Sequence, residues 1–154
     1  MQGNTQAETR RTRSSFLEEL TFLELCRTTD ILSRKVAEVL KAEGLSSNQY
    51  NVLRILRGAP GGLPCGEIGN RMITRDPDIT RLLDRLEKRS LIARSREARD
   101  RRMVMAEITP AGLELLVRLD GPVLDVHKAQ LGHLGRERLD ILKSLLQLAR
   151  ERVA

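Results

Sequence analysis

The stretch from Ile79 to Ile108 constrains the fold most, because its hydrophobic period changes partway along. Apolar residues first recur at i, i+3, i+4 and i+7, the spacing of a helix that is buried on one side. These residues are Ile79, Leu82, Leu83 and Leu86. From Ile92 onward the residues alternate in two short runs joined by a charged loop, which predicts a β-hairpin. A one-sided helix that runs into an arginine-rich hairpin is the outline of a winged helix-turn-helix.

The polar face of the predicted helix carries side chains suited to a DNA groove. A major groove admits a helix, and arginine donates bidentately to O6 and N7 of guanine. Arg81 and Arg85 lie one turn apart on this face, next to Thr80, which could meet a phosphate or a thymine methyl. Asp78 either accepts from cytosine N4 or disfavours a phosphate there. The alternative is a solvated face whose charges form ordinary ion pairs.

The hairpin is expected to contact the DNA backbone. Its arginines are Arg94, Arg96, Arg99, Arg101 and Arg102. Positive charges this close repel one another, and an anionic partner such as a phosphate or a minor groove relieves the repulsion. Asp100, which belongs to the same predicted DNA-binding set, is expected to hold the hairpin by pairing with Arg102 or Arg99. The alternative is a charged hairpin that is merely solvated.

The composition agrees with a polyanionic partner. The formal net charge is +6 and the pI is about 10.0, although many basic proteins with other roles share these values. Only 2% of residues are aromatic, which argues against base-stacking on single strands. The sequence shows no signal peptide and no apolar run long enough to span a membrane. We therefore expect a cytoplasmic protein with double-stranded DNA, and no membrane, as its partner.

Few residues suggest other chemistry. Cys26 and Cys65 are too few for a disulfide framework or a four-ligand metal site. Cys65 lies near a predicted helix N-terminus, where a thiol pKa can fall, so a redox role stays open beside inert packing. His127 and His133 have one near carboxylate, Asp125, which is too little for a metal site. No catalytic motif is present, so we expect neither an enzyme nor a metal or cofactor.

Further helices are expected on both sides of this unit. The sequence predicts a polar, frayed and flexible tail over 1–14, a long helix over 15–43 that ends at Gly44, and a helix that reaches Arg57 after a Ser46–Gln49 capping box. A short helix should cover 64–72, and Asp76 with Pro77 should begin the amphipathic helix. Thr109 and Pro110 begin another helix, which Pro122 either kinks or ends, and the last helix covers 135–153.

These segments together resemble the MarR family of bacterial regulators. The resemblance rests on GLSSNQYNVLRIL, EIGNRM, DITRLLDRLEKRSLIAR and ARDRRMVMAEITPAG and covers roughly residue 15 to the C-terminus. Its most specific parts are the D-x-R of Asp100 and Arg102 and the T-P-A-G that begins at Thr109. The chain departs from the family at Pro64, where a Ser or Thr cap is common, and at Ser90, where glycine is common. If residue 90 needs a positive φ, serine there costs about 1 kcal/mol.

The resemblance implies a homodimer with a small-molecule effector. A winged helix-turn-helix over 44–110 would be flanked by dimerisation helices over 15–43 and 111–154. It implies a repressor that a small ligand or an oxidant releases from DNA. Tyr50 lies where family members hold phenolic ligands, and core packing explains that residue equally well. The expected function is sequence-specific regulation of transcription, and the alternative is a winged-helix module that binds protein and no operator.

Overall fold

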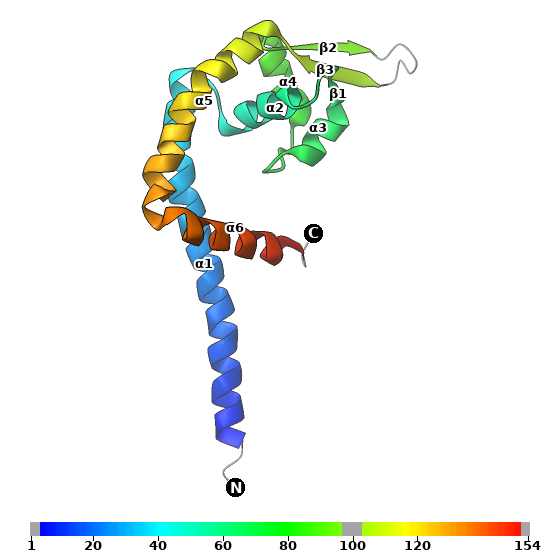
Figure 1. The fold of residues 1–154 in the computed structure, drawn as a ribbon. Helices are drawn as coiled ribbons and strands as arrows, with labels where there is room; N and C mark the ends of the chain where they lie inside the picture. The colour runs from blue at the N-terminus through cyan, green and yellow to red at the C-terminus, as the bar shows by residue number, and fades with distance from the viewer. Residues whose placement is uncertain (1–3, 97–102, 152–154) are drawn as a thin grey trace. The chain divides into compact units, whose positions relative to one another are not determined.

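The computed structural model describes residues 4–96 and 103–151. Figure 1 shows the elements in chain order: α1 (Asn4–Ala42), α2 (Ser47–Arg57), β1 (Leu63–Pro64), α3 (Cys65–Arg71), α4 (Ile79–Lys88), β2 (Ile92–Arg96), β3 (Val104–Ile108), α5 (Pro110–Leu131), the 3-10 helix η1 (Gly132–Leu134) and α6 (Gly135–Glu151). The chain divides into two compact units, residues 1–35 and residues 36–154. Within the described residues, the first unit is the larger part of α1, and the second holds the end of α1 and all the other elements.

The second unit contains the predicted winged helix. Its antiparallel sheet has the order β1-β3-β2, and Arg94 of β2 lies opposite Ala106 of β3. The expected fold class, mainly α with a small β-hairpin wing, is confirmed. Strand β1 was not predicted, because it has two residues and includes Pro64. It can approach β3 because Gly62 precedes it with φ +81, where a Cβ atom would lie 2.7 Å from the carbonyl oxygen of Ala106.

The core confirms the predicted amphipathic helix. Leu82, Leu83 and Leu86 of α4 are buried, and Ile79 is partly buried against the same cluster. The other fully buried large side chains come from the helices and strands around α4. They are Leu40, Val52, Leu53, Leu56, Ile68, Ile92, Leu116 and Leu119. Burial of the leucine side of α4 leaves its charged side at the surface.

Helix ends follow the predicted capping residues at three places. The Ser46 hydroxyl accepts the N–H of Gln49 at 3.2 Å, and the Gln49 side chain accepts the N–H of Ser46 at 2.9 Å. Gly44 takes φ +67 after α1. The Thr109 hydroxyl accepts the N–H of Gly112 at the start of α5. Pro122 lies inside α5, so it does not end that helix.

The start of α4 corrects the sequence prediction. Asp78, not Asp76, is the N-cap: its Oδ1 accepts the N–H of Arg81 at 3.1 Å. Asp76 instead accepts the N–H of Asp78 at 3.0 Å, which forms a turn that delays the helix. The second oxygen of Asp76 accepts from Asn48 of α2 at 2.8 Å. Pro77 therefore lies in the turn before α4 and not at its first position.

The first helix also begins earlier than expected. Helix α1 starts at Asn4, so most of the segment predicted as a frayed tail is helical. This segment is polar, but its three Arg and two Gln residues have good helix propensity. Within residues 4–96 and 103–151, we find no helix that combines the length and the hydropathy needed to cross a bilayer.

Candidate nucleic-acid interface

The exposed face of α4 presents three of the predicted contact residues together. Thr80, Arg81 and Arg85 are all exposed, whereas the leucines of the same helix are buried. The Arg81 side chain is 71% exposed, and its Nε lies 3.1 Å from Oδ2 of Asp78. An ion pair this exposed adds little stability, so the guanidinium can exchange it for a nucleic-acid acceptor at low cost. The predicted grouping on one helical face is therefore present.

Asp78 differs from the arginines because it is the N-cap of α4. One of its oxygens caps α4 through the N–H of Arg81, and the other faces the Arg81 guanidinium. Both oxygens are thus already engaged within the first turn. Asp78 orients Arg81 as well as beginning the helix, and a contact with cytosine would compete with these bonds.

The turn before α4 is held from α2. Asn51 accepts the N–H of Ile73 at 2.9 Å, and Asn48 donates to Asp76 at 2.8 Å. The pKa of the Asp76 carboxyl is lowered, first by the N–H of Asp78, then by Asn48 and by the nearby charge of Arg85. Sequence reasoning missed both asparagines. Their partners lie more than twenty residues along the chain, so no local spacing signals the contacts.

Arg94 is not placed like Arg96, the other predicted wing arginine within the described residues. Its Nε and Nη2 donate to Oε2 of Glu87 at 2.9 and 2.6 Å, and Nη2 also lies 2.5 Å from Oδ1 of Asp84. Its own backbone N–H donates to Oε1 of Glu87 at 3.1 Å. The Arg94 side chain is only 22% exposed. Hydrogen bonds from Arg94 lower the pKa of the Glu87 carboxyl, so this pair is charged at neutral pH.

The remaining wing residues are described only in part. Arg96 is exposed at the end of β2. Arg99, Asp100, Arg101 and Arg102 lie outside the described residues. The predicted pairing of Asp100 with Arg102 or Arg99 therefore stays a prediction.

The other candidate residues are Tyr50 and the two cysteines. Tyr50 is 8% exposed in the core, and the Arg54 guanidinium lies 5.8 Å from its ring centroid. Burial raises the pKa of the Cys65 thiol, and the charge of Arg94 opposes this only in part. This contradicts the lowered pKa that the nearby helix N-terminus suggested. Cys26 is exposed on α1. Across the described residues, His, Cys, Asp and Glu form no group of three that could hold a metal.

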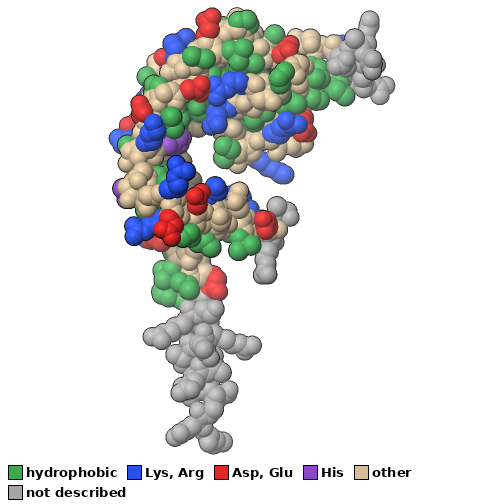
Figure 2. Space-filling model, viewed as in Figure 1, with side chains coloured by type: hydrophobic (Ala, Val, Ile, Leu, Met, Phe, Trp, Pro, Cys, Tyr) green, Lys and Arg blue, Asp and Glu red, His purple; other side chains and the backbone are tan. Residues whose placement is uncertain are grey.

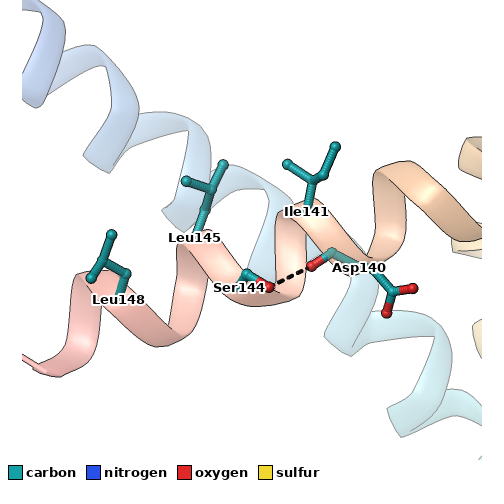
Figure 3. A pocket seen from close by; sticks show the side chains of 5 residues that line it. All are labelled: Asp140, Ile141, Ser144, Leu145 and Leu148. Carbon is teal, nitrogen blue, oxygen red and sulfur yellow. Dashed lines mark hydrogen bonds between the residues drawn. The ribbon is translucent and has the colours of Figure 1, made fainter.

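Apolar side chains lie exposed on the helices outside the winged domain. On α1, Phe16, Leu17 and Phe22 are each about 60% exposed, and none of the described α6 residues is buried. Figure 2 shows hydrophobic side chains at the surface along α6. Figure 3 shows Ile141, Leu145 and Leu148 on one side of α6, where they line a groove with Asp140 and Ser144. Because one helix supplies all five residues, this groove is a surface feature and not an enclosed cavity.

Comparisons with known proteins agree with this geometry. Residues 45–104 match the model of the MarR family. A crystal structure of a MarR transcription factor from Planctomyces limnophilus is 40% identical, with 84% of this chain and 95% of that chain covered and a TM-score of 0.67. The HTH-type transcriptional regulator FarR of Neisseria gonorrhoeae is 28% identical over 79% of this chain and 83% of its own length.

A further solved structure combines the fold with a nucleic acid. The transcriptional repressor CouR, bound to a 23-mer DNA duplex, is 29% identical, covers 87% of this chain and 94% of that chain, and has a TM-score of 0.78. The winged helix, its exposed arginine face and these similarities lead to one assignment. The chain belongs to the MarR family of transcriptional regulators.

Proposed function

We propose that the protein is a homodimeric repressor that binds duplex DNA sequence-specifically and is released by a small ligand. The observation that carries the DNA-binding part is the exposed face of α4, where Thr80, Arg81 and Arg85 lie opposite a buried leucine face. CouR, a relative with the same fold, has been solved on a DNA duplex. A regulator that binds chromosomal DNA in a bacterium would act in the cytoplasm.

The proposed contacts divide by role. Thr80, Arg81, Arg85 and, where it can leave its cap, Asp78 would meet base edges in the major groove. Arg96 and the arginines at 99, 101 and 102 would supply phosphate contacts that position the protein but carry no sequence information. Asp100 would hold the wing through one of these arginines.

The dimer is supported by apolar surface. Phe and Leu side chains on α1 are exposed, and no described residue of α6 is buried. Exposed apolar patches of this kind often mark interaction sites. We propose that residues 15–43 and 111–154 pair with a second copy, and that residues 44–110 form the DNA-binding domain. Two copies related by a two-fold axis would enter successive major grooves, with half-sites about 10 bp apart.

Release would follow from a shift between two dimer arrangements. A ligand can bias this balance only by its differential affinity for the two. Tyr50 remains the one proposed ligand residue, on the strength of the family resemblance. Its position in the core offers no separate support.

Selection of bound duplexes from a random pool tests the proposal. We expect a two-fold symmetric consensus whose half-sites lie about one helical turn apart. Binding should weaken by about 10³–10⁵ between 50 and 200 mM salt if 6 to 10 phosphates are touched. If no duplex is enriched and none binds at low salt, the alternative gains support: a winged-helix module whose basic wing faces an acidic protein.

A further inference from the structure

We propose that Arg94 is a positioning residue, which with Glu87 and Asp84 locks the wing onto the recognition helix α4 and does not itself contact phosphate. This inference rests on the proposed DNA-binding function and assigns a role inside that site. It also separates Arg94 from the other wing arginines, with which the sequence had grouped it.

The geometry of the contact is that of a clamp between two elements. Glu87 accepts hydrogen bonds from both the backbone N–H and the guanidinium of Arg94. It therefore fixes strand β2 as well as the Arg94 side chain. Asp84, one turn earlier on α4, accepts a hydrogen bond from Nη2, which also donates to Glu87. Arg94 itself lies in the middle of β2 opposite Ala106, which is fully buried. The clamp therefore joins one turn of the recognition helix to the base of the wing.

The local charge argues against a phosphate at Arg94. Two carboxylates face one guanidinium, so the cluster of Asp84, Glu87 and Arg94 carries a formal charge of about −1. A phosphate could reach the guanidinium only by displacing short, charge-assisted hydrogen bonds. Its side chain is 22% exposed, against 71% for Arg81. Arg81 thus has the position of a contact residue, and Arg94 has that of an internal brace.

The clamp should affect how tightly the protein binds DNA. A recognition helix in the groove and a wing on the backbone must reach the same duplex in fixed relative positions. A brace between them places both before binding, so ordering the wing costs less binding free energy. Loss of the brace should weaken DNA binding even where no DNA contact has been removed.

Glu87→Gln separates a clamp from a purely electrostatic role of the cluster, because the two roles predict opposite changes in DNA affinity. Removing a negative charge near the interface should tighten DNA binding if the cluster acts only through its electrostatic field. A clamp predicts the opposite, because Gln cannot accept the same bonds from the guanidinium. We expect binding to the selected duplex to weaken about tenfold. Tighter or unchanged binding would overturn the proposal.

Glu67→Gln is the matched control. Glu67 forms an ion pair with Arg71 within α3 at 2.9 Å, so the change removes the same charge from the same domain without touching the wing. Its DNA affinity should be unchanged or slightly higher. A loss equal to that of Glu87→Gln would mean that any carboxylate removed from this domain has the effect, and the clamp would be rejected.

Arg94→Lys adds a second test. Lysine keeps the charge that a phosphate contact needs, but it lacks the planar fork that bridges two carboxylates. The clamp predicts a loss close to that of Glu87→Gln, and the double variant should lose little more, because both changes break one unit. Near-normal binding of Arg94→Lys, or additive losses, would contradict it. Urea unfolding of each variant shows whether the domain is still folded at the assay concentration.

The outcomes keep this inference distinct from the proposed function. If the unaltered protein enriches no duplex, the DNA-binding function fails before any variant is tested. If it binds and Glu87→Gln binds more tightly, only the clamp fails.

Discussion

The hydroxyl of Thr109 donates to the carbonyl of Ser90 at 2.7 Å, and the same oxygen accepts the N–H of Gly112 at 3.1 Å. The backbone N–H of Thr109 also donates to the carbonyl of Leu91 at 3.1 Å. One residue thus ties the end of the recognition helix to the first turn of α5. This junction lies between the proposed DNA-binding and dimerisation parts of the chain.

Replacing Thr109 with valine tests the junction. Valine keeps the shape but removes both hydroxyl bonds, and loss of a helix cap costs about 0.5–2 kcal/mol. We expect the free energy of unfolding in urea to fall by about 1–2 kcal/mol at fixed protein concentration. Thr109→Ser retains the hydroxyl and should lose less than half of this. Equal losses for the two variants would mean that the methyl group matters as much as the hydroxyl, and no loss in Thr109→Val would show that the hydroxyl bonds do not stabilise the junction.

Ser90→Gly should stabilise the protein. Among the described residues, Ser90 is the one non-glycine residue with a positive φ, at 56°. Left-handed backbone costs a residue with a Cβ about 1–2 kcal/mol, and glycine pays little of it. After the larger unfolded-state entropy of glycine is subtracted, we expect a gain of about 0.5–1 kcal/mol in urea unfolding.

The control for this change is Ser33→Gly, at an exposed position inside α1. There the backbone is helical, so glycine should cost about 0.5 kcal/mol. A loss of stability in Ser90→Gly would show that residue 90 depends on its side chain more than on its backbone angle.

Two glycines in α5 should respond oppositely to alanine. A Cβ on Gly112 would lie 2.3 Å from the carbonyl oxygen of Leu91 and 2.8 Å from Cγ1 of Ile108, so the backbone must shift. Gly121 has no atom within 4 Å of that position. We expect Gly112→Ala to destabilise by about 3 kcal/mol and Gly121→Ala to stabilise by up to about 1 kcal/mol. Thermal unfolding of the two variants measures both, and the same sign for both would contradict the packing described.

Acid should weaken the turn before the recognition helix. The folded-state pKa of Asp76 is lowered, first by the N–H of Asp78 and then by Asn48. A lowered carboxyl pKa contributes stability above its unfolded value of about 3.9, and this is lost as pH falls through the folded value. Glu67 and Glu87 are shifted in the same direction by Arg71 and Arg94.

Asp76→Asn isolates the Asp76 part of this dependence. The variant should be less stable than the parent near neutral pH, and the difference should shrink as the pH falls below about 4. Urea unfolding between about pH 7 and pH 3 measures it. A difference that stays constant with pH would show that the Asp76 charge does not contribute.

Local signals in the sequence predicted much of the fold and part of the site. The Ser46–Gln49 box, Gly44, Thr109 and the leucines of α4 act within a few residues, so spacing alone identified them. The two-residue strand β1 was not predicted from the sequence, because it forms only by pairing with β3, which lies far along the chain. Asp76 and Asp78 both have capping chemistry, and the bond from Asn48 across the fold helps to decide between them.

The least predictable feature was the pair of carboxylates that Arg94 contacts. In the sequence Arg94 is one of several wing arginines. Its partners lie on a helix that comes before it, at separations of seven and ten residues. These separations cross the change from helix to strand, so neither period alone predicts the contacts. Only packing of β2 against α4 brings these charges together. Arg81, by contrast, could be placed on the exposed face from the helical period alone.

The central claim is that the exposed face of α4 reads base sequence, and Arg81→Ala on two duplexes tests it most directly. We predict that the variant loses about 1–3 kcal/mol of binding free energy on the duplex selected by the parent protein, and little on random duplex of the same length. An equal loss on both duplexes would assign Arg81 to the phosphate backbone, and no loss on either would remove α4 from the interface.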